Sequence, residues 1–188
     1  MKRSDIKILQ LTRNKFPPEI RVLKEGKTLF SGGYGSAVLC PPMEGQSEKE
    51  VWEGIDIFRP SVLGARSAVD KGLGEAALFS YAWYKAIRQV IGEYQPNVLH
   101  VHDIWLGRVA FWASRNEKIV LDLHENMPAA VKEYQKGYSG PHLWFRKIFH
   151  SPSRIFRYER GLLSRSDLVL ACVKEARDRV LQNHPELD

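Results

Sequence analysis

Short apolar runs that alternate with helical segments are the feature that most constrains how this chain folds. Six runs have the length and composition of β-strands, and they cover residues 6–12, 35–40, 54–59, 97–103, 118–124 and 167–173. Strands that alternate with helices predict a mainly parallel sheet with right-handed crossovers. The sequence therefore predicts a Rossmann-like, doubly wound α/β fold whose strands, counted along the chain, lie in the order 3-2-1-4-5-6.

The segments between the runs complete this pattern. A helix is expected within residues 17–33, because prolines open the segment and glycines close it. One long helix or two short ones are expected over residues 67–94, and another helix over 106–114. Residues 41–52 are expected to form a loop, and the alternating run 54–59 a peripheral strand with one solvated face. The length of 188 residues suits one domain covering residues 1–188.

Polar residues cluster where three of the expected strands end. Rossmann-like sheets bind ligands outside the carboxyl ends of their strands, at the point where the strand order reverses. In the expected order, that point lies between the first and fourth strands. The residues placed there are Arg13, Asn14 and Lys15 after strand one, His102 and Asp103 after strand four, and His124 and Glu125 after strand five.

Period-two spacing gives the histidines different expected roles. His100 and His102 point to the same face of a strand, and His102 is nearer the carboxyl end where a ligand would lie. His100 is therefore expected to be a hydrogen-bonded structural histidine under a helix. Asp122 shares a face with His124 and is expected to support it.

The same cluster permits other functions. His102, Asp103, His124 and Glu125 are residue types that bind zinc, manganese or iron, so a small metal-dependent hydrolase is one alternative. A non-catalytic binding module is another. The sequence alone leaves both open.

Charge and composition indicate an anionic partner. The chain has 28 basic and 22 acidic residues, a net charge of +6. No Gly-x-Gly-x-x-Gly motif follows the first strand, so a dinucleotide site is not expected, but Arg13 and Lys15 would attract a phosphate or a charged sugar. Residues 142–158 interleave aromatic and basic side chains, which suits either an anionic membrane surface or packing within the domain. No nucleic-acid-binding pattern is present.

The cysteines and the hydropathy pattern indicate the compartment. Cys40 and Cys172 lie in apolar runs and are expected to be buried, reduced thiols. No apolar segment has the length of a signal peptide or a membrane span. The expected location is the cytoplasm. The basic aromatic stretch leaves peripheral attachment to the inner face of the membrane as an alternative.

Five segments in this order resemble the amino-terminal domain of family 4 retaining glycosyltransferases, which have the GT-B architecture of two Rossmann-like domains. The segments are KILQL at residues 7–11, PEIRVLKE at 18–25, PNVLHVHD at 96–103, VLDLHE at 120–125 and YERGLLSRSDLV at 158–169. The resemblance covers nearly the whole chain. One departure is the first loop, which lacks the consecutive glycines that the family often has near the donor phosphates.

The resemblance implies an activity and a role for each site residue. The chain would be the acceptor-side half of an enzyme that moves a hexosyl-type sugar from a nucleotide-sugar to a glycan, lipid or small-molecule acceptor, as in polysaccharide biosynthesis. His124 and Asp103 would be catalytic, whereas Arg13, Asn14, His102 and Glu125 would bind the acceptor. No metal or cofactor is implied.

The resemblance also implies a second domain. The nucleotide-sugar would be a co-substrate bound mainly by a carboxy-terminal domain, which would follow Asp188 and is absent from this sequence. The chain by itself is therefore expected to be inactive. Transfer would retain the anomeric configuration by front-face attack.

Overall fold

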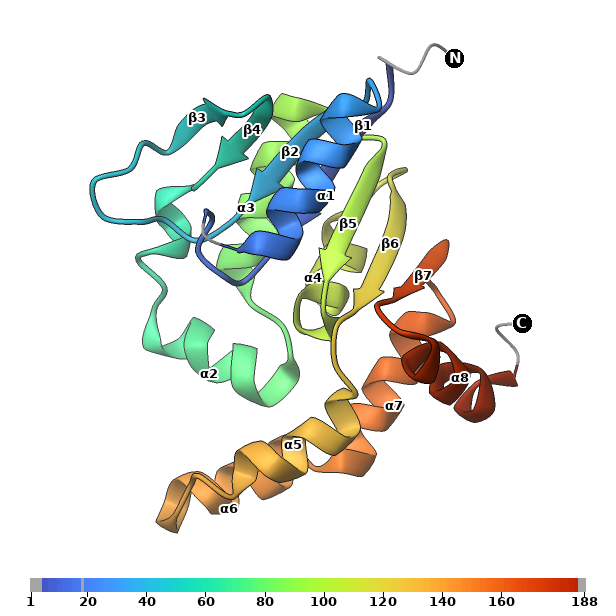
Figure 1. Ribbon diagram of the computed structural model, residues 1–188. Coiled ribbons are helices and arrows are strands. Elements are labelled where there is room, and N and C mark those ends of the chain that lie inside the picture. The colour runs from blue at the N-terminus through green and yellow to red at the C-terminus, as the bar shows by residue number, and fades with distance from the viewer. Residues whose placement is uncertain (1–4, 18, 186–188) are drawn as a thin grey trace.

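A seven-stranded sheet lies between helices in the computed structural model, which describes residues 5–17 and 19–185 (Figure 1). The strand order is β3-β4-β2-β1-β5-β6-β7. The strands are β1 (Lys7–Leu11), β2 (Gly35–Leu39), β3 (Lys49–Trp52), β4 (Ile55–Phe58), β5 (Val98–His102), β6 (Lys118–Leu123) and β7 (Leu168–Ala171). All neighbouring pairs are parallel except β3 and β4.

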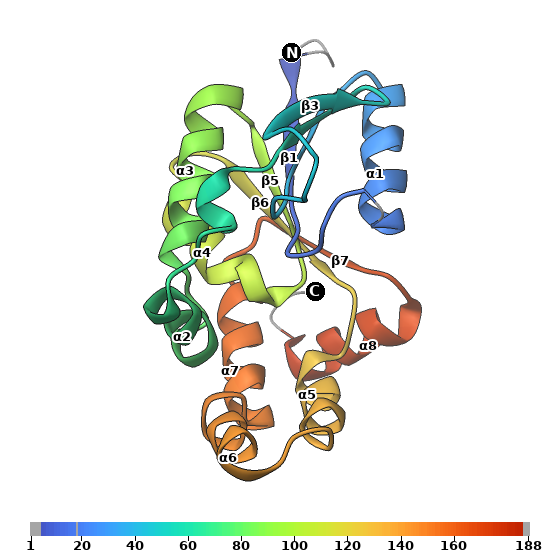
Figure 2. The same ribbon diagram turned by 90° about the vertical axis from the view of Figure 1, so that its left-hand side faces the viewer.

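Helices cover both faces of the sheet. They are α1 (Ile20–Ser31), α2 (Ala68–Ala77), α3 (Tyr81–Tyr94), α4 (Gly107–Ala113), α5 (Met127–Gln135), α6 (Gly140–Phe149), α7 (Pro152–Leu163) and α8 (Lys174–Asn183), with short 3-10 turns η2 (Ser61–Leu63) and η3 (Ile104–Leu106). Helix α1 lies on one face, and α3 and α4 lie on the other (Figure 2).

The expected topology is confirmed. The six predicted strands are present, and their spatial order is the predicted 3-2-1-4-5-6 with β3 added at one edge. The order reverses between β1 and β5, which pair in parallel from Ile8 with Val98 to Leu11 with Val101. The sheet therefore has its ligand-binding edge where the sequence places the polar cluster.

The segment 67–94 forms two helices because its residues supply two helix starts. The Ser67 side chain accepts from the backbone N–H of Asp70 at the start of α2, and Ser80 does the same for Trp83 at the start of α3. Between them, Leu78 has the left-handed φ of 52°, which ends α2.

Two predictions about the edge of the sheet that contains β3 and β4 are wrong. Residues 49–52 are not part of a loop, because they form β3 and pair antiparallel with β4. The turn between the two strands, Glu53–Gly54, has φ values of 51° and 81°, as a two-residue hairpin requires. Strand β4 is consequently interior rather than peripheral, and its predicted solvated face is partly covered, because Phe58 is buried and Asp56 is half-buried.

The buried arginine beside β4 shows how this edge is held. Arg59 is 1% exposed. Its guanidinium donates to the backbone oxygen of Phe16 at 2.8 Å, to that of Ser47 at 3.1 Å and to Glu50 Oε1 at 2.7 Å. A buried charge is tolerated only with such partners. Arg59 therefore ties the loop before α1 to β3.

The prediction for the two cysteines is half right. Cys40 is buried, and burial raises the pKa of its thiol to about 11. Cys172 is exposed, so its predicted burial is wrong. It follows β7, the last strand of the sheet, where Leu168 and Leu170 are also exposed. An apolar run at the edge of a sheet lacks the neighbour that would cover it.

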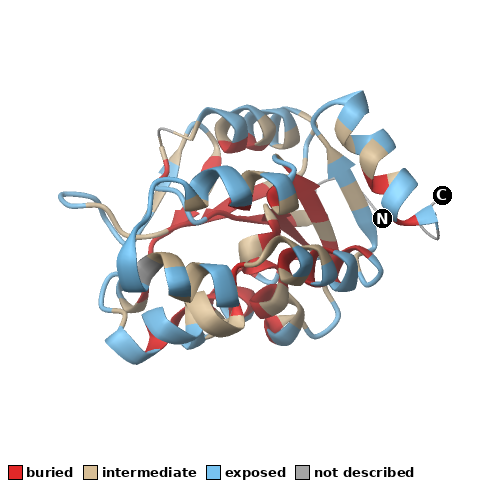
Figure 3. Ribbon diagram, turned by 90° about the horizontal axis from the view of Figure 1, so that it is seen from below, coloured by how far each residue is buried: buried red, intermediate tan, exposed pale blue. Residues whose placement is uncertain are grey.

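The core has two parts, and buried residues follow the sheet in Figure 3. The larger part lies between the sheet and helices α3, α4 and α7, and the smaller part lies under α1. Gly26 allows α1 to approach closely, since a Cβ there would lie 2.7 Å from Cδ1 of Ile55. The close approach matters for the site, because α1 also reaches the histidines of β5.

The basic aromatic stretch forms parts of two helices with different surroundings. Helix α7 packs on the domain through residues such as Ile155 and Leu162, whereas α6 has exposed Trp144 and Ile148. Helices α5 and α6 project beyond the sheet (Figure 1). The side chain of His142 lies outside the described residues, as does Pro18 at the predicted start of α1. Among the described helices, none has the length and apolar character needed to cross a membrane.

Candidate active site

A pocket of about 370 Å³ opens at the carboxyl ends of β1, β5 and β6. It is lined by six of the seven residues predicted at this edge, Arg13, Asn14, His102, Asp103, His124 and Glu125, whereas the exposed Lys15 is not part of its lining. It is also lined by residues that were not predicted, namely Thr12, Glu19, Val22, Trp105, Met127 and Tyr134. The structure thus brings the predicted residues together, while their roles stay predictions.

His124 lies at the centre of this pocket's polar contacts. It follows β6, and its Nε2 lies 2.5 Å from Oδ2 of Asp122. Its backbone N–H donates to Oδ1 of Asp103 at 3.3 Å, and its Nδ1 lies 3.7 Å from Oδ2 of the same residue. Carboxylates on two sides therefore hold both the ring and the backbone of His124.

The charges around His124 favour its protonated form. Burial alone would lower the pKa of His124, but the hydrogen bond to Asp122 and the charges of Asp122 and Asp103 outweigh it and raise this pKa. Burial would likewise raise the pKa of Asp122, but hydrogen bonds with His102 and His124 lower it far below its ordinary value. Asp122 thus contacts His124 as its place on the same face implies, and its supporting role stays a prediction.

Asp103 has an unusual backbone conformation. Its φ of 64° and ψ of 164° are rare for a residue other than glycine, and such strain is concentrated at functional sites. Burial raises the pKa of Asp103, and the neighbouring His124 opposes the shift. The strained backbone directs Asp103 back toward His124 at the start of η3.

The two strand histidines lie behind His124. Their rings stack with centroids 4.5 Å apart, which confirms that they share a face. His102 Nε2 lies 3.1 Å from Oε1 of Gln10, and its Nδ1 lies 3.3 Å from Nε2 of His124. His100 is buried under α1 as expected, but its Nε2 has no hydrogen bond to the described residues, contrary to the prediction.

The remaining predicted residues form the rim. The guanidinium of Arg13 lies 5.6 Å from the ring centre of Trp105. Asn14 donates to Oε2 of Glu19 at 2.7 Å. Glu125 accepts from the Tyr134 hydroxyl at 2.5 Å, a bond that raises the pKa of the tyrosine.

Comparison with known proteins identifies the family. Residues 19–186, most of the chain, match the family described as "Glycosyl transferase 4-like domain". The chain belongs to this family. The resemblance stated from five sequence segments is therefore confirmed.

Solved structures have the same fold as this glycosyltransferase domain. Sucrose-phosphate synthase from Thermosynechococcus elongatus matches with a TM-score of 0.66 and 12% identity, over 94% of this chain and 44% of that chain. A second structure of that synthase matches with a TM-score of 0.59 and 12% identity, over 94% of this chain and 81% of that one. At such identity the likeness shows the fold alone. No curated protein matches the chain.

A second pocket adjoins the first in this glycosyltransferase domain. It has a volume of about 220 Å³, shares Arg13 and Trp105 with the first pocket, and is also lined by Arg66, Lys71 and Glu75. Sequence reasoning missed these residues, because they lie on or beside a helix whose contact with the sheet edge is not encoded by local spacing. The two pockets together form a site with a basic side.

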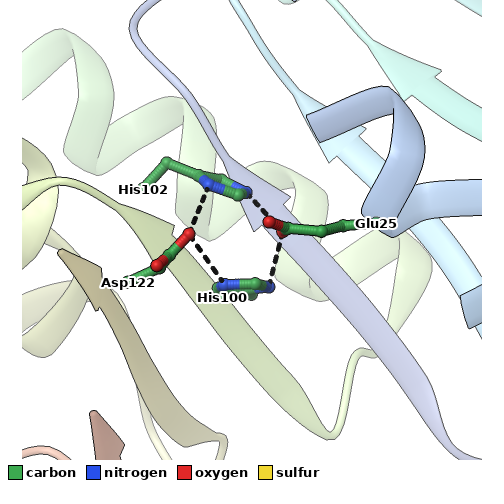
Figure 4. A group of neighbouring side chains, drawn as sticks. All are labelled: Glu25, His100, His102 and Asp122. Carbon is green, nitrogen blue, oxygen red and sulfur yellow. Dashed lines mark ion pairs between the residues drawn. The ribbon is translucent and has the colours of Figure 1, made fainter. Parts of the chain in front are cut away.

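The metal-dependent alternative needs ligand atoms that converge on one point. Among the described residues, the histidine and acidic side chains whose ligand atoms converge are Glu25, His100, His102 and Asp122 (Figure 4). The set that the hydrolase would use shares only His102 with this group. Family membership favours a transferase over this hydrolase.

Proposed function

We propose that this domain is the acceptor-side half of a retaining glycosyltransferase that moves a sugar from a nucleotide-sugar to a hydroxyl of a glycan, lipid or small-molecule acceptor. The observation that carries the proposal is the pocket at the carboxyl ends of β1, β5 and β6, in which His124 contacts both Asp122 and Asp103. Family membership supports a transferase, and the chain spans less than half of the larger synthase chain that it matches.

Retention of configuration follows from attack on the same face from which the leaving group departs. The bond from the anomeric carbon to the donor phosphate breaks, the bond to the acceptor oxygen forms, and the acceptor proton passes to the departing phosphate. The donor would be held mainly by a second domain facing this pocket. No metal or cofactor is needed for this step.

The residues of this chain would position the acceptor and the transferred sugar. His124, whose ring is fixed by Asp122, would donate a hydrogen bond to the reacting sugar or the acceptor. Asp103 would accept a hydrogen bond from the acceptor hydroxyl and orient it toward the anomeric carbon. Both groups would act through a preorganised geometry, which costs no rearrangement at the moment of reaction.

The rim residues would bind the rest of the acceptor. Arg13 and Trp105 form a cationic and aromatic wall between the two pockets, which suits the faces and substituents of a sugar. Asn14 and Glu125 line the same space and would supply hydrogen bonds, and the ring of His102 would contact the acceptor there. Basic residues of the second pocket favour an acceptor that carries an anionic group.

A peripheral location at the inner face of the membrane is part of the proposal. Helix α6 exposes Trp144 (67%) and Ile148 (45%) beside exposed Lys147, on a part of the molecule that projects beyond the sheet. Aromatic and aliphatic side chains next to basic ones are typical of helices that lie on anionic lipid. Attachment there would bring the pocket toward a lipid-linked acceptor.

The test uses the protein that contains this domain together with its donor-binding domain. His124→Ala is expected to lower kcat about 100-fold or more, because a positioned polar group is lost from the transition state. Lys132→Ala, on the exposed side of α5, is the control and should keep wild-type turnover. Circular dichroism checks that both variants fold. Wild-type turnover in a folded His124→Ala variant would remove His124 from the site.

A further inference from the structure

Four side chains, three of them buried, form a closed ring of close contacts beneath the pocket. Glu25 comes from α1, His100 and His102 from β5, and Asp122 from β6 (Figure 4). Oε2 of Glu25 lies 3.7 Å from a nitrogen of each histidine, and Oδ2 of Asp122 lies 3.9 Å from His100 and 3.4 Å from His102. Two carboxylates thus face the same two imidazoles.

The ring leaves polar atoms without hydrogen bonds. Among the described residues, Oε2 of Glu25 and Nε2 of His100 are buried atoms of the ring that have no hydrogen-bond partner and can offer a lone pair. His100 is 7% exposed and Oε2 of Glu25 is itself buried, so bulk water does not supply the missing bonds. Buried unpaired polar atoms are costly, and a bound ion is one way in which proteins satisfy them.

We propose that Glu25, His100, His102 and Asp122 bind one divalent metal ion, and that zinc fits them best. Imidazole and carboxylate ligands suit Zn²⁺, whose tetrahedral sites use bonds of about 2.0–2.1 Å and therefore place neighbouring ligand atoms about 3.4 Å apart. The ligand atoms of the four residues all lie within 4.8 Å of one another. A small inward movement of side chains closes the site, and the ion's charge offsets the two carboxylates.

The surroundings of the ring match those of a metal site. Histidines that bind metals usually donate their second ring N–H to an oxygen, and ligating carboxylates are themselves hydrogen-bonded. His102 Nε2 lies 3.1 Å from Oε1 of Gln10, which leaves Nδ1, the nitrogen nearer Asp122, as the ligand atom. Asp122 in turn contacts His124 Nε2 at 2.5 Å.

The site also has a route for the ion. The Glu25 side chain is 34% exposed, whereas those of the other three ligands are less than 10% exposed. An ion can therefore approach the ring from the side of α1, past the partly exposed Glu25 side chain. The ion would join α1 to β5 and β6. It would bind Asp122, which is the residue that orients His124. This role goes beyond the proposed transfer, since the ion lies beneath the pocket and takes no part in the reaction.

The test is a zinc titration of the 188-residue chain after removal of metals with a chelator. We expect one Zn²⁺ per chain with a Kd of about 1 μM or tighter, and a higher Tm when zinc is present, because binding to the folded state stabilises it. Co²⁺ replaces zinc as a spectroscopic probe and should give the visible absorption of a four-coordinate site with nitrogen and oxygen ligands. Absence of stoichiometric zinc overturns the proposal.

Variants locate the binding. His100→Ala and Glu25→Gln should each weaken zinc binding by about tenfold or more, because each removes a ligand. Glu25→Gln alters a partly exposed side chain and serves as the second variant if His100→Ala fails to fold. Cys172→Ser removes an exposed thiol outside the ring and should bind zinc like the wild type. Equal zinc affinity in all three variants would place the ion elsewhere and overturn the proposal.

Zinc binding and sugar transfer are measured separately. The titration contains no donor or acceptor, so its failure says nothing against the proposed transfer. Wild-type turnover in the His124→Ala variant would contradict the proposed transfer site, but it would not contradict zinc binding that has been measured for the ring.

Discussion

Each of three buried charged residues in this domain is paired with a few polar groups, some near in sequence and some distant. Asp122 is held between His102 and His124 at the site, and Arg59 ties β3 to the loop before α1. Asp70 does the same between two helices: its carboxylate accepts from Arg66 at 2.7 Å, from the Ser80 hydroxyl at 2.7 Å and from the backbone N–H of Ala82 at 3.0 Å. A buried charge that has all of its hydrogen-bond partners is well accommodated, whereas removal of one partner destabilises the fold.

Asp70→Asn is expected to destabilise the fold in a pH-dependent way. Burial would raise the pKa of Asp70, but its hydrogen bonds with Arg66, Ser80 and Ala82 outweigh burial and lower it. A carboxyl whose folded pKa is depressed stabilises the fold above its unfolded pKa of about 3.9, and this stabilisation is lost as the pH falls through the folded pKa. The variant should therefore lose about 2–3 kcal/mol at pH 7.

Urea unfolding at about pH 7 and about pH 3, on either side of the unfolded pKa, measures this difference. The free energies of unfolding of the wild type and of Asp70→Asn should lie closer together at the lower pH. An equal gap at both values would show that the charge of Asp70 is not what stabilises the junction of α2 and α3.

At the scale of elements, close packing of α1 decides the geometry of the site. Helix α1 carries Glu25 toward the histidines of β5, and it reaches them because Gly26 packs directly on the side chain of Ile55. Residue 26 is glycine because a Cβ would not fit there, and not because the backbone conformation requires glycine. Helix α1 itself is short, so tertiary packing rather than propensity holds it in place.

Gly26→Ala should destabilise the domain although alanine favours helices. The new Cβ would lie 2.7 Å from Ile55 Cδ1 and 3.1 Å from Gln10 Nε2, so α1 or Ile55 must move, at a cost of about 1–3 kcal/mol. Gly72→Ala in α2 is the matched control: no atom lies within 4 Å of its Cβ, and it should gain up to about 1 kcal/mol. Thermal unfolding of both variants gives the comparison, and equal shifts of Tm would contradict it.

Helix α6 is the element that is proposed to meet the membrane. Trp144→Ala should reduce binding to vesicles that contain phosphatidylserine, because an exposed indole supplies much of the buried area at the lipid surface. Sedimentation with vesicles measures it, and neutral vesicles test the contribution of Lys147 and its basic neighbours. Trp112→Ala, at an exposed indole on α4, is the control. Equal binding of the two variants would argue against α6 as the membrane face.

In the whole molecule, we propose that the pocket forms one wall of a larger site. Its polar residues gather at the carboxyl edge of the sheet, which faces the end of the molecule that carries α2, α5 and α6 (Figure 1). The family and the fold are established, but the proposed reaction also needs a group that holds the donor phosphate. The described residues after β1 include no glycine-rich phosphate loop.

The 188-residue chain should therefore bind an acceptor without transferring sugar to it. When the chain is mixed with a nucleotide-sugar and an acceptor, no glycosylated product is expected, whereas a protein that also contains the donor-binding domain should form it. Mass spectrometry of the acceptor detects the product. Product formed by the chain on its own would show that the donor is bound here, and the second pocket beside Arg66 and Lys71 would be the place to look.

Local sequence patterns are enough to predict the order of the parallel strands and the edge at which the polar residues meet. Strand periodicity is local, and the handedness of the crossovers leaves few arrangements, so Arg13, His102 and His124 were placed together before any contact was known. The residues that complete the site follow instead from long-range packing. Pairing of β3 with β4, the exposure of Cys172 and the approach of Glu25 to the histidines all depend on contacts between segments that local patterns do not relate, because no local pattern encodes which surface another element will cover.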